Sequence, residues 1–269
     1  MAVCSRTRAG AQLLADEVDG VPAYDSLEEL LRREAIDVVH VCTPNAVHAD
    51  QALLALEHGA HVVCETPLAT STAESGAMLD ALKGSDRIGA VAYHVRGYPL
   101  VEHMRWTVAD GELGELRVVH GRYVCDDALL VYEGWRLLPE SSGPTYVTAD
   151  LGAHWLDLAE HVTGSRGGFT WDQESPNELL HRHAELPTQV VVKDPGANAG
   201  RAGEFARYPA GHAEGYGDAF RVILTDAYRA MAGEPHGSFP TFADGHRGMQ
   251  VLAATLRSAA DGGWVSVEN

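Results

Sequence analysis

The chain has 269 residues, 45% of them hydrophobic, and can therefore bury one large core or two modest ones. It carries 38 acidic and 20 basic residues, a formal charge of −18 at pH 7. This charge disfavours nucleic acid and acidic membrane surfaces as partners. The sequence shows neither an apolar run of membrane-spanning length nor a leader pattern, so we expect a cytoplasmic protein without membrane contact.

The first hundred residues alternate short apolar runs with amphipathic segments. Ser26 with Glu29, and Ser71 with Glu74, have the spacing of helix capping boxes. We expect strands in "MAVCSR", "IDVVHVCTPN", "HVVCE" and "RIGAVAYHV", and helices near residues 8–18, 26–34, 46–57 and 71–83. Apolar strands separated by helices are typical of a parallel sheet that is buried on both faces. The pattern predicts an α/β fold with a Rossmann-like domain over residues 1–97.

Residues 98–269 have a mixed pattern typical of an α+β domain. We expect helices from Pro99 to about Asp110, in "TADLGAHWLDLAEHVTG", at 216–232 and at 243–260. Strands are expected in "GELGELRVVHGRYVC", "GGFTWDQES", "ELLHRH" and the terminal "WVSVE". The stretch from Leu186 to Gly215 is too rich in turn-forming residues for regular structure.

Cysteine spacing gives no sign of a metal or redox site. The chain has four cysteines, and no two of them have the close spacing of metal-binding or redox motifs: Cys4, Cys42, Cys64 and Cys125. We therefore expect buried free thiols in a reducing compartment.

Two loops follow consecutive parallel strands and should meet at one edge of the sheet. They carry a set of polar residues and prolines that is typical of a ligand crevice: Thr43, Pro44, Asn45, His48, Glu65, Thr66 and Pro67. Either loop alone would also suit an ordinary turn. Ser5 and Arg6 follow the first strand, where an arginine would favour the 2′-phosphate of NADP over the free hydroxyl of NAD. Most exposed arginines, however, are only solvated.

A polar stripe lies on the helix expected around residue 150. Asp150, His154, Asp157 and His161 fall on one face at helical spacing. A carboxylate one turn before an imidazole can fix its tautomer and raise its basicity, as general acid–base catalysis needs. A helix-stabilising Asp–His pair is the alternative. No further ligands stand at suitable spacing, so we expect no metal.

These features together resemble the Gfo/Idh/MocA family of NAD(P)-dependent oxidoreductases, which act on sugars and cyclitols. The resemblance rests on "DVVHVCTPNAVHADQALLALEHGAHVVCETPLA", "AYHVRGYPLV", "GELGELRVVHGRYV", "WRLLPESSGPTYVTADLGAHWLDLAEHVTG" and the two last helices. It implies binding of NAD or NADP, a polyol or sugar-like small-molecule substrate, and allows a homo-oligomer. It makes Asp150 and His154 the acid–base pair.

The same resemblance assigns further positions. Thr66 occupies the place of the family's catalytic lysine. The two loops, with Arg96, Trp135 and Arg136, would form the cofactor crevice, and Tyr93, His94 and His212 would face the substrate.

Three departures from the family pattern bear on activity. Thr66 supplies no positive charge, which we expect to weaken catalysis by about 10² to 10³. The family's first βα unit, with its G-x-G-x-x-G turn, has no counterpart in the sequence, so we expect an incomplete Rossmann-like sheet. Finally, "HVTGSRGGFTWDQESPNELL" passes almost at once from the catalytic helix to a late strand, which predicts a reduced α+β domain.

Three hypotheses follow. The chain is a weakened NAD(P)-dependent oxidoreductase, a catalytically degenerate relative that serves as a binding or partner module, or an enzyme that uses Asp150 and His154 for proton transfer without nicotinamide.

Overall fold

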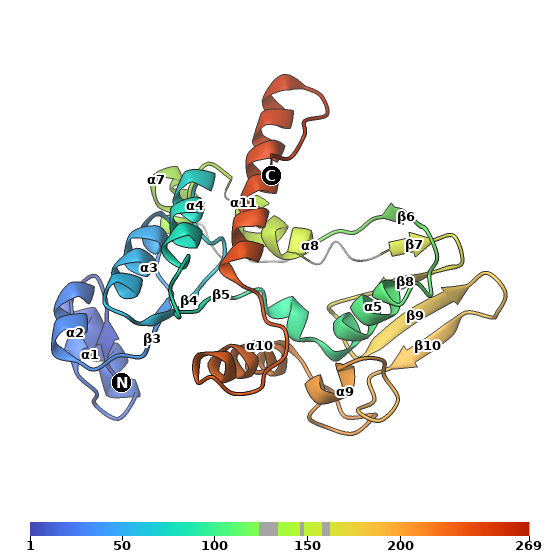
Figure 1. Cartoon of the computed structure of the whole chain (residues 1–269), viewed down its shortest axis with the longest axis horizontal. Helices are drawn as coiled ribbons and strands as arrows, with labels where there is room; N and C mark the ends of the chain where they lie inside the picture. The colour runs from blue at the N-terminus through green and yellow to red at the C-terminus, as the bar shows by residue number, and fades with distance from the viewer. Residues whose placement is uncertain (124–133, 146–147, 158–161, 269) are drawn as a thin grey trace.

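The computed structural model describes residues 1–123, 134–145, 148–157 and 162–268 (Figure 1). Parallel strands occupy the N-terminal part and an antiparallel sheet the later part. This arrangement confirms the predicted α/β class with a Rossmann-like parallel portion and a separate α+β portion. Within the described residues, no helix has both the length and the apolar composition needed to span a bilayer.

The parallel strands form two separate sheets. β1 (Val3–Cys4) pairs with β2 (Ala23–Tyr24), and β3 (Val38–Val41), β4 (His61–Cys64) and β5 (Gly89–Val91) pair in that order. In the described residues, β1 is not hydrogen-bonded to β3. The helices between them are α1 (Arg8–Glu17), α2 (Leu27–Arg33), α3 (His48–Glu57) and α4 (Thr72–Ala81).

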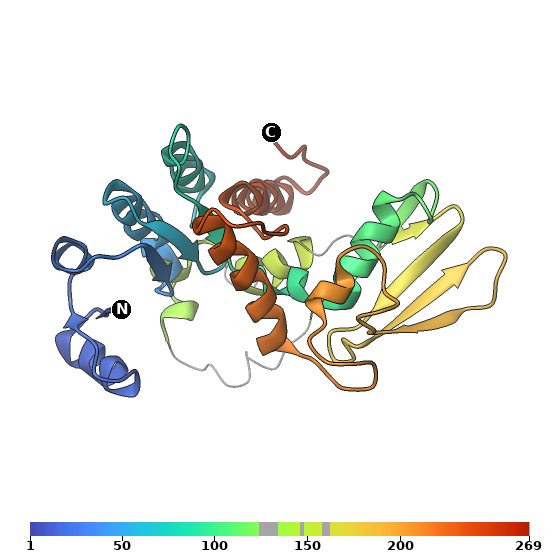
Figure 2. The ribbon, with the colours of Figure 1, turned by 60° about the horizontal axis from the view of Figure 1, so that its bottom comes forward.

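The larger parallel sheet is covered on both faces, as its continuous apolar strands predict. Val62 and Cys64 of β4 pack with Met78 in the core that α3 and α4 cover. Val63, which points the other way, packs with Ala227 of α10 (Tyr216–Met231). Figure 2 shows this layering, with α3 and α4 on one side and α10 on the other.

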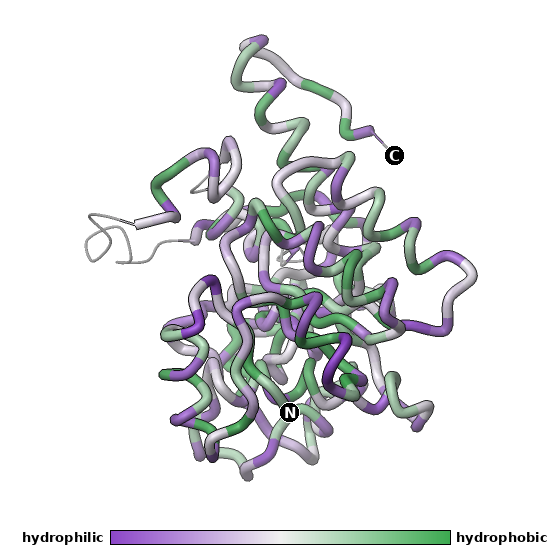
Figure 3. The backbone as a smooth tube through the Cα atoms, turned by 90° about the vertical axis from the view of Figure 1, so that its left-hand side faces the viewer, coloured by the Kyte–Doolittle hydropathy of each residue, from purple (hydrophilic) through white to green (hydrophobic). Residues whose placement is uncertain are grey.

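Capping residues fix where several helices begin. The hydroxyl of Ser71 accepts a hydrogen bond from the backbone N–H of Glu74, and Ser26 does the same for Glu29. Figure 3 shows hydrophilic and hydrophobic residues alternating along the outer helices, as the amphipathic patterns predict. The predicted starts of α2 and α4 are confirmed.

The last two helices return to the parallel sheet. Thr241 caps α11 (Phe242–Asp261) and forms a bridge with Ala90 of β5. α10 lies directly against the 3-10 helix η2 (His94–Gly97). A Cβ on Gly97 would stand 2.1 Å from the carbonyl oxygen of Ala219, so only glycine allows this approach. The C-terminal helices thereby hold the segment after β5 in place.

The antiparallel sheet has the order β10-β9-β8-β7-β6. Its strands are β6 (Leu116–Val119), β7 (Val162–Gly164), β8 (Gly167–Trp171), β9 (Glu178–His183) and β10 (Gln189–Val192). Helix α5 (Pro99–Ala109) covers one face, where Met104 packs in one cluster with Phe169 and Leu179. The remaining elements are η1 (Asn45–Val47), η3 (Trp135–Leu137), α7 (Pro139–Ser142), the π-helix η4 (Thr148–Gly152), α8 (Ala153–Asp157) and α9 (Ala202–Phe205).

Four expectations about local structure are wrong. The helix expected to run to Gly164 consists of η4 and α8, and β7 already begins at Val162. The stretch expected to be irregular contains β10 and α9, because β10 pairs with a distant strand, β9. The described residues of "WVSVE" form no strand. Cys42 is exposed, whereas Cys64 is buried as expected and Cys125 lies outside the described residues.

Candidate active site

The two loops predicted to form a crevice are tied together by a buried histidine. His48 begins α3, with its Nδ1 2.9 Å from the carbonyl oxygen of Pro67 and its Nε2 2.8 Å from that of Thr43. Burial lowers the pKa of His48, and the two carbonyl contacts oppose that shift. The fully buried ring therefore joins the segments that follow β3 and β4.

Asn45 fastens the first loop to a later segment. Its side-chain Nδ2 donates a hydrogen bond to the carbonyl oxygen of Ser142 in α7, at 3.0 Å. Pro44 directly precedes η1, and the Thr43 hydroxyl donates to Gln51 at 3.1 Å. The first loop is thus held at both ends of its polar stretch.

The second loop reaches the helix that carries the predicted acid–base pair. The hydroxyl oxygen of Thr66 lies 3.3 Å from Nε2 of His154, within hydrogen-bond distance. Thr66 is the second residue after the buried strand β4, and His154 is the second residue of α8. Residues 88 positions apart in sequence thereby meet at the carboxyl edge of the sheet.

Two neighbouring imidazoles in this region have buried nitrogen atoms without partners. The rings of His94 and His154 lie 4.8 Å apart in an edge-on arrangement. Within the described part of the chain, both ring nitrogens of His94 and the Nδ1 of His154 are buried and make no hydrogen bond. Because buried polar atoms in proteins almost always have a partner, three such atoms at one place indicate a site for a ligand.

Burial also keeps both imidazoles neutral. It lowers the pKa of His94 to about 3, with a further contribution from His154. It lowers the pKa of His154 to about 4. A neutral imidazole can accept a proton, which is the property that a general base requires.

Glu65 lies between charges of both signs. Burial raises its pKa, a hydrogen bond from the backbone of Thr66 and the positive charge of Arg136 oppose the shift, and Asp150 adds to it. Arg136 also lies over the ring of Trp135, at 4.9 Å. Glu65, Asp150 and Arg136 therefore share one electrostatic neighbourhood, although they come from three distant segments.

Arg96 has a structural role here that differs from its expected place in the cofactor crevice. Its guanidinium pairs with both carboxylate oxygens of Asp157 in α8 and with Asp244 of α11, the latter at 3.0 Å. These contacts raise the pKa of Arg96 against the opposing effect of burial. Arg96 links η2, α8 and α11, and so it positions the helix that carries His154.

The other predicted residues are more scattered. Tyr93 is buried, with its ring 6.0 Å from that of His154. Ser5 and the exposed Arg6 follow β1 on the separate two-stranded sheet. His212 is exposed in the loop before α10, 3.4 Å from the carbonyl oxygen of Ala210. His161 lies outside the described residues.

Aromatic residues that sequence reasoning missed surround the two imidazoles. Phe220 stacks on His94 with ring centroids 5.1 Å apart, and Tyr216 approaches the same ring to 4.3 Å. Tyr123 stacks on His154 at 6.2 Å. Tyr216 and Phe220 stand at i and i+4 at the start of α10, and this spacing is the signal that could have placed them on one helix face.

Two hollows flank this region. One of about 270 Å³ is lined by Tyr123, Leu151 and Trp155, among others, beside the His154 helix. The other, of about 690 Å³, runs along α10, and of its lining residues Phe220 contacts the His94 ring. The residues that line these two hollows include neither Thr66 nor His154.

Neither lysine of the chain replaces the missing charge at Thr66. Lys83 is exposed and pairs with Asp80 at 2.6 Å. Lys193 is buried and pairs with Glu214 at 2.8 Å. Both ammonium groups are thus engaged elsewhere in the fold.

Comparison with protein families gives matches over two parts of the chain. Residues 1–93 match the model described as "Oxidoreductase family, NAD-binding Rossmann fold". Residues 101–167 match the GFO/IDH/MocA C-terminal domain. The two models describe the N- and C-terminal domains of one family.

Curated relatives match over part of their length. D-glucoside 3-dehydrogenase of Escherichia coli is 32% identical over 168 residues, which cover 61% of this chain and 46% of that protein. Levoglucosan dehydrogenase of Pseudarthrobacter phenanthrenivorans is 32% identical over 148 residues, which cover 52% of this chain and 38% of that protein. The matched region thus spans less than half of these two relatives.

Solved structures match over nearly the whole chain. An inositol dehydrogenase homologue from Azotobacter vinelandii, complexed with NAD⁺, superposes with a TM-score of 0.84 at 25% identity, covering 96% of this chain and 87% of that chain. A levoglucosan dehydrogenase in complex with NADH and levoglucosan gives a TM-score of 0.90 at 22% identity, covering 98% and 89%. The second likeness supports the fold alone.

Proposed function

The chain belongs to the Gfo/Idh/MocA family of oxidoreductases, and from this premise we propose that it transfers a hydride between nicotinamide and a hydroxyl or carbonyl group of a sugar- or cyclitol-like substrate. The D-glucoside 3-dehydrogenase and levoglucosan dehydrogenase among its relatives support this substrate class by their names. The substrate is a small polyol-like molecule, and the rate is lower than in family members that keep the lysine.

One observation carries the proposal. The Thr66 hydroxyl, at the carboxyl edge of the parallel sheet, meets the Nε2 of a buried, neutral His154 at 3.3 Å. Carboxyl edges of such sheets are where α/β proteins bind nucleotides, and a neutral imidazole accepts the proton that leaves an alcohol as it is oxidised. The Thr66–His154 contact thus places a proton acceptor beside the edge of the sheet at which the cofactor is expected to bind.

The polar groups around His94 and His154 suit the nicotinamide end of the cofactor. The buried nitrogens of His94 and the Nδ1 of His154 lack partners within the described residues, which is expected where a polar ligand completes the contacts. The chemistry that nicotinamide supplies when bound is the gain or loss of a hydride. The residues that would hold it follow β3 and β4 or lie in η3: Thr43, Pro44, Asn45, Glu65, Pro67, Trp135 and Arg136.

Residues of the chain account for proton handling. His154 is the group that takes the hydroxyl proton during oxidation and returns it during reduction. Thr66 holds Nε2 from the sheet side, and Arg96 holds α8 through Asp157. Asp150, one turn before His154 in the sequence, is the proposed second member of the acid–base pair, and its charge raises the pKa of Glu65. Tyr93, His94 and His212 form the substrate side of the proposed site.

The choice of cofactor rests on weaker evidence. Arg6 is exposed after β1, where it could pair with a 2′-phosphate, and this favours NADP. The match of residues 1–93 to an NAD-binding Rossmann model supports a nicotinamide cofactor of either kind. A cytoplasmic location and assembly into a homo-oligomer remain part of the proposal.

A two-part experiment tests the proposed function. Calorimetry with NADH and NADPH measures cofactor binding, and a panel of sugars and cyclitols is then screened for reduction of NAD⁺ or NADP⁺. We expect saturable binding and slow turnover that the His154→Gln variant loses. Failure of both cofactors to bind at millimolar concentration would refute the proposal. Solvent deuterium exchange into a substrate without cofactor would instead favour proton transfer independent of nicotinamide.

A further inference from the structure

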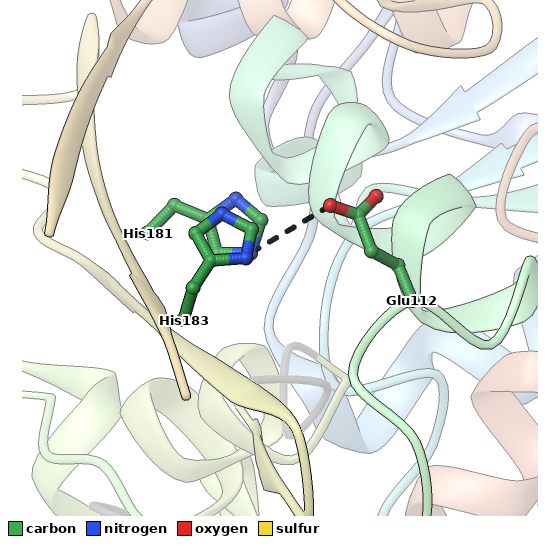
Figure 4. A group of neighbouring side chains, drawn as sticks. All are labelled: Glu112, His181 and His183. Atoms are coloured by element: carbon green, nitrogen blue, oxygen red, sulfur yellow. Dashed lines mark ion pairs between the residues drawn. The ribbon is translucent and has the colours of Figure 1, made fainter. Parts of the chain in front are cut away.

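A second group of titratable side chains lies on the antiparallel sheet. His181 and His183 stand two positions apart on β9, and Glu112 belongs to the turn that follows α5 (Figure 4). Side chains at i and i+2 of a strand point to the same face, so both imidazoles face the layer in which α5 lies. Figure 4 shows the two rings beside each other, with the carboxylate of Glu112 directed toward them.

The three side chains are close enough to share one ion. Their candidate ligand atoms all lie within 4.8 Å of one another, and the centroids of the two rings are 3.7 Å apart. The Nε2 of His181 is 4.0 Å from Oε1 of Glu112, which is too long for a hydrogen bond. Zinc bonds of about 2.0 to 2.2 Å in a tetrahedron place ligand atoms about 3.4 Å apart. Small side-chain rotations would close the difference.

One of the three ligands is buried and unpartnered. His181 is 5% exposed, and its Nε2 makes no hydrogen bond within the described residues. Its ring packs against Phe169 with centroids 4.4 Å apart. An orphaned buried nitrogen that faces a second imidazole and a carboxylate is expected where an ion completes the contacts.

The backbone of the third ligand residue is fixed in place. The N–H of Glu112 donates a hydrogen bond to the carbonyl oxygen of Thr107 at 3.2 Å, so the carboxylate starts from a defined point at the end of α5.

We propose that Glu112, His181 and His183 form a binding site for one divalent transition-metal ion, with Zn²⁺ as the best fit. Two imidazoles and a carboxylate suit zinc, whereas Mg²⁺ and Ca²⁺ prefer oxygen ligands alone. Water completes the fourth position on the side of the exposed Glu112. The ion ties the end of α5 to β9, away from the Thr66–His154 pair, and its role is to stabilise this face of the sheet.

The test uses the full chain, freed of metal with a chelator and then titrated with Zn²⁺ by calorimetry. We expect one strong site per chain. His183→Gln and Glu112→Gln should each weaken it at least about 10- to 100-fold, the loss typical even of outer-shell changes at metal sites. Both positions are more exposed than His181, so these variants should fold.

Matched controls separate the site from general metal binding by surface side chains. His58→Gln removes an exposed histidine, and Glu115→Gln removes an exposed acid from the same turn as Glu112. Both controls should keep the strong site. Titration with Co²⁺ adds a spectroscopic readout, because tetrahedral Co²⁺ absorbs visible light strongly and the two site variants should lose that absorption. If the wild-type chain binds no Zn²⁺ strongly, the proposal is overturned. It is also overturned if both His183→Gln and Glu112→Gln keep the strong site.

Discussion

Two of the polar clusters that are buried in the described part of the chain differ in one respect. On the C-terminal side, Lys193 and Glu214 pair at 2.8 Å, and the Lys193 ammonium also donates to the carbonyl oxygen of Tyr208 at 2.8 Å. Beside the parallel sheet, His94 and His154 leave three ring nitrogens buried without a hydrogen bond in the described residues. Both clusters cost desolvation, and the first offsets part of that cost with its ion pair and the carbonyl contact of Lys193.

The difference separates a structural role from a chemical one. A buried charge whose partners are all protein groups holds segments together and cannot readily be released. Buried imidazoles without protein partners instead keep their nitrogens available for a ligand or a proton. Under the proposed function, the Lys193 cluster serves stability and the His154 cluster serves catalysis, and each of the following experiments tests one side of this comparison.

The largest expected effect is on turnover. Replacing His154 with Gln keeps a polar group near Thr66 but removes the proton acceptor, so we expect the rate to fall by about 10² to 10⁴. The rate is measured from nicotinamide absorbance with any polyol that the wild-type chain oxidises. The denaturation midpoint should change little. A variant that loses stability and activity in parallel would count against a catalytic role.

Breaking the paired cluster should affect stability and leave the active site intact. Lys193→Met strands the buried charge of Glu214, and we expect a loss of about 3 to 5 kcal/mol in the free energy of unfolding, measured by denaturant titration. Lys83→Met is the matched control, because that exposed ion pair should contribute less than about 1 kcal/mol. Equal effects of the two substitutions would contradict the structural role of Lys193.

Restoring a charge beside His154 should raise activity. Thr66→Lys places an ammonium group where the family has its lysine, and we expect the rate to rise by about 10². Thr66→Val, which removes the hydroxyl and adds no charge, is the companion variant and should be slower than wild type. If the lysine variant is no faster than the valine variant, the absence of a positive charge at position 66 does not limit the rate.

A further expected effect concerns stability in acid. The pKa of His94 is about 3 in the folded chain and about 6.5 when unfolded, so the unfolded chain binds more protons between these values. Stability is therefore full above pH 6.5 and falls as the pH drops toward 3, by about 1.4 kcal/mol per pH unit for this ring. His94→Phe should flatten the dependence of the melting temperature on pH. An unchanged profile would show that His94 is not held neutral by the fold.

Much of the fold follows from local sequence. The caps at Ser26 and Ser71, the apolar strand before Cys64 and the Pro at the start of α5 all appear where the sequence predicts them. The meeting of the Glu65 loop with the His154 segment also agrees with the geometry expected at the edge of a parallel sheet. Local patterns were sufficient for the caps and the strand, whereas the meeting of the two distant segments followed from the expected strand order and the family resemblance.

The remaining features depend on contacts between distant residues. β10 forms only because it pairs with β9, and the π-helix at Thr148–Gly152 has no periodicity that a sequence window can detect. The ion pairs that tie Arg96 to Asp157 and Asp244 depend on three segments brought together by the fold. The Glu112, His181 and His183 group escapes detection for the same reason, because its acid is about seventy residues from its histidines.

The most direct test of the comparison is an NMR titration of the His154 ring in the full chain, with its signal identified by its absence in His154→Gln. We predict that the imidazole stays neutral through pH 6 and titrates near its expected pKa of about 4. A midpoint at the ordinary histidine value of about 6.5 would show a solvated ring and contradict a buried, neutral proton acceptor at this position.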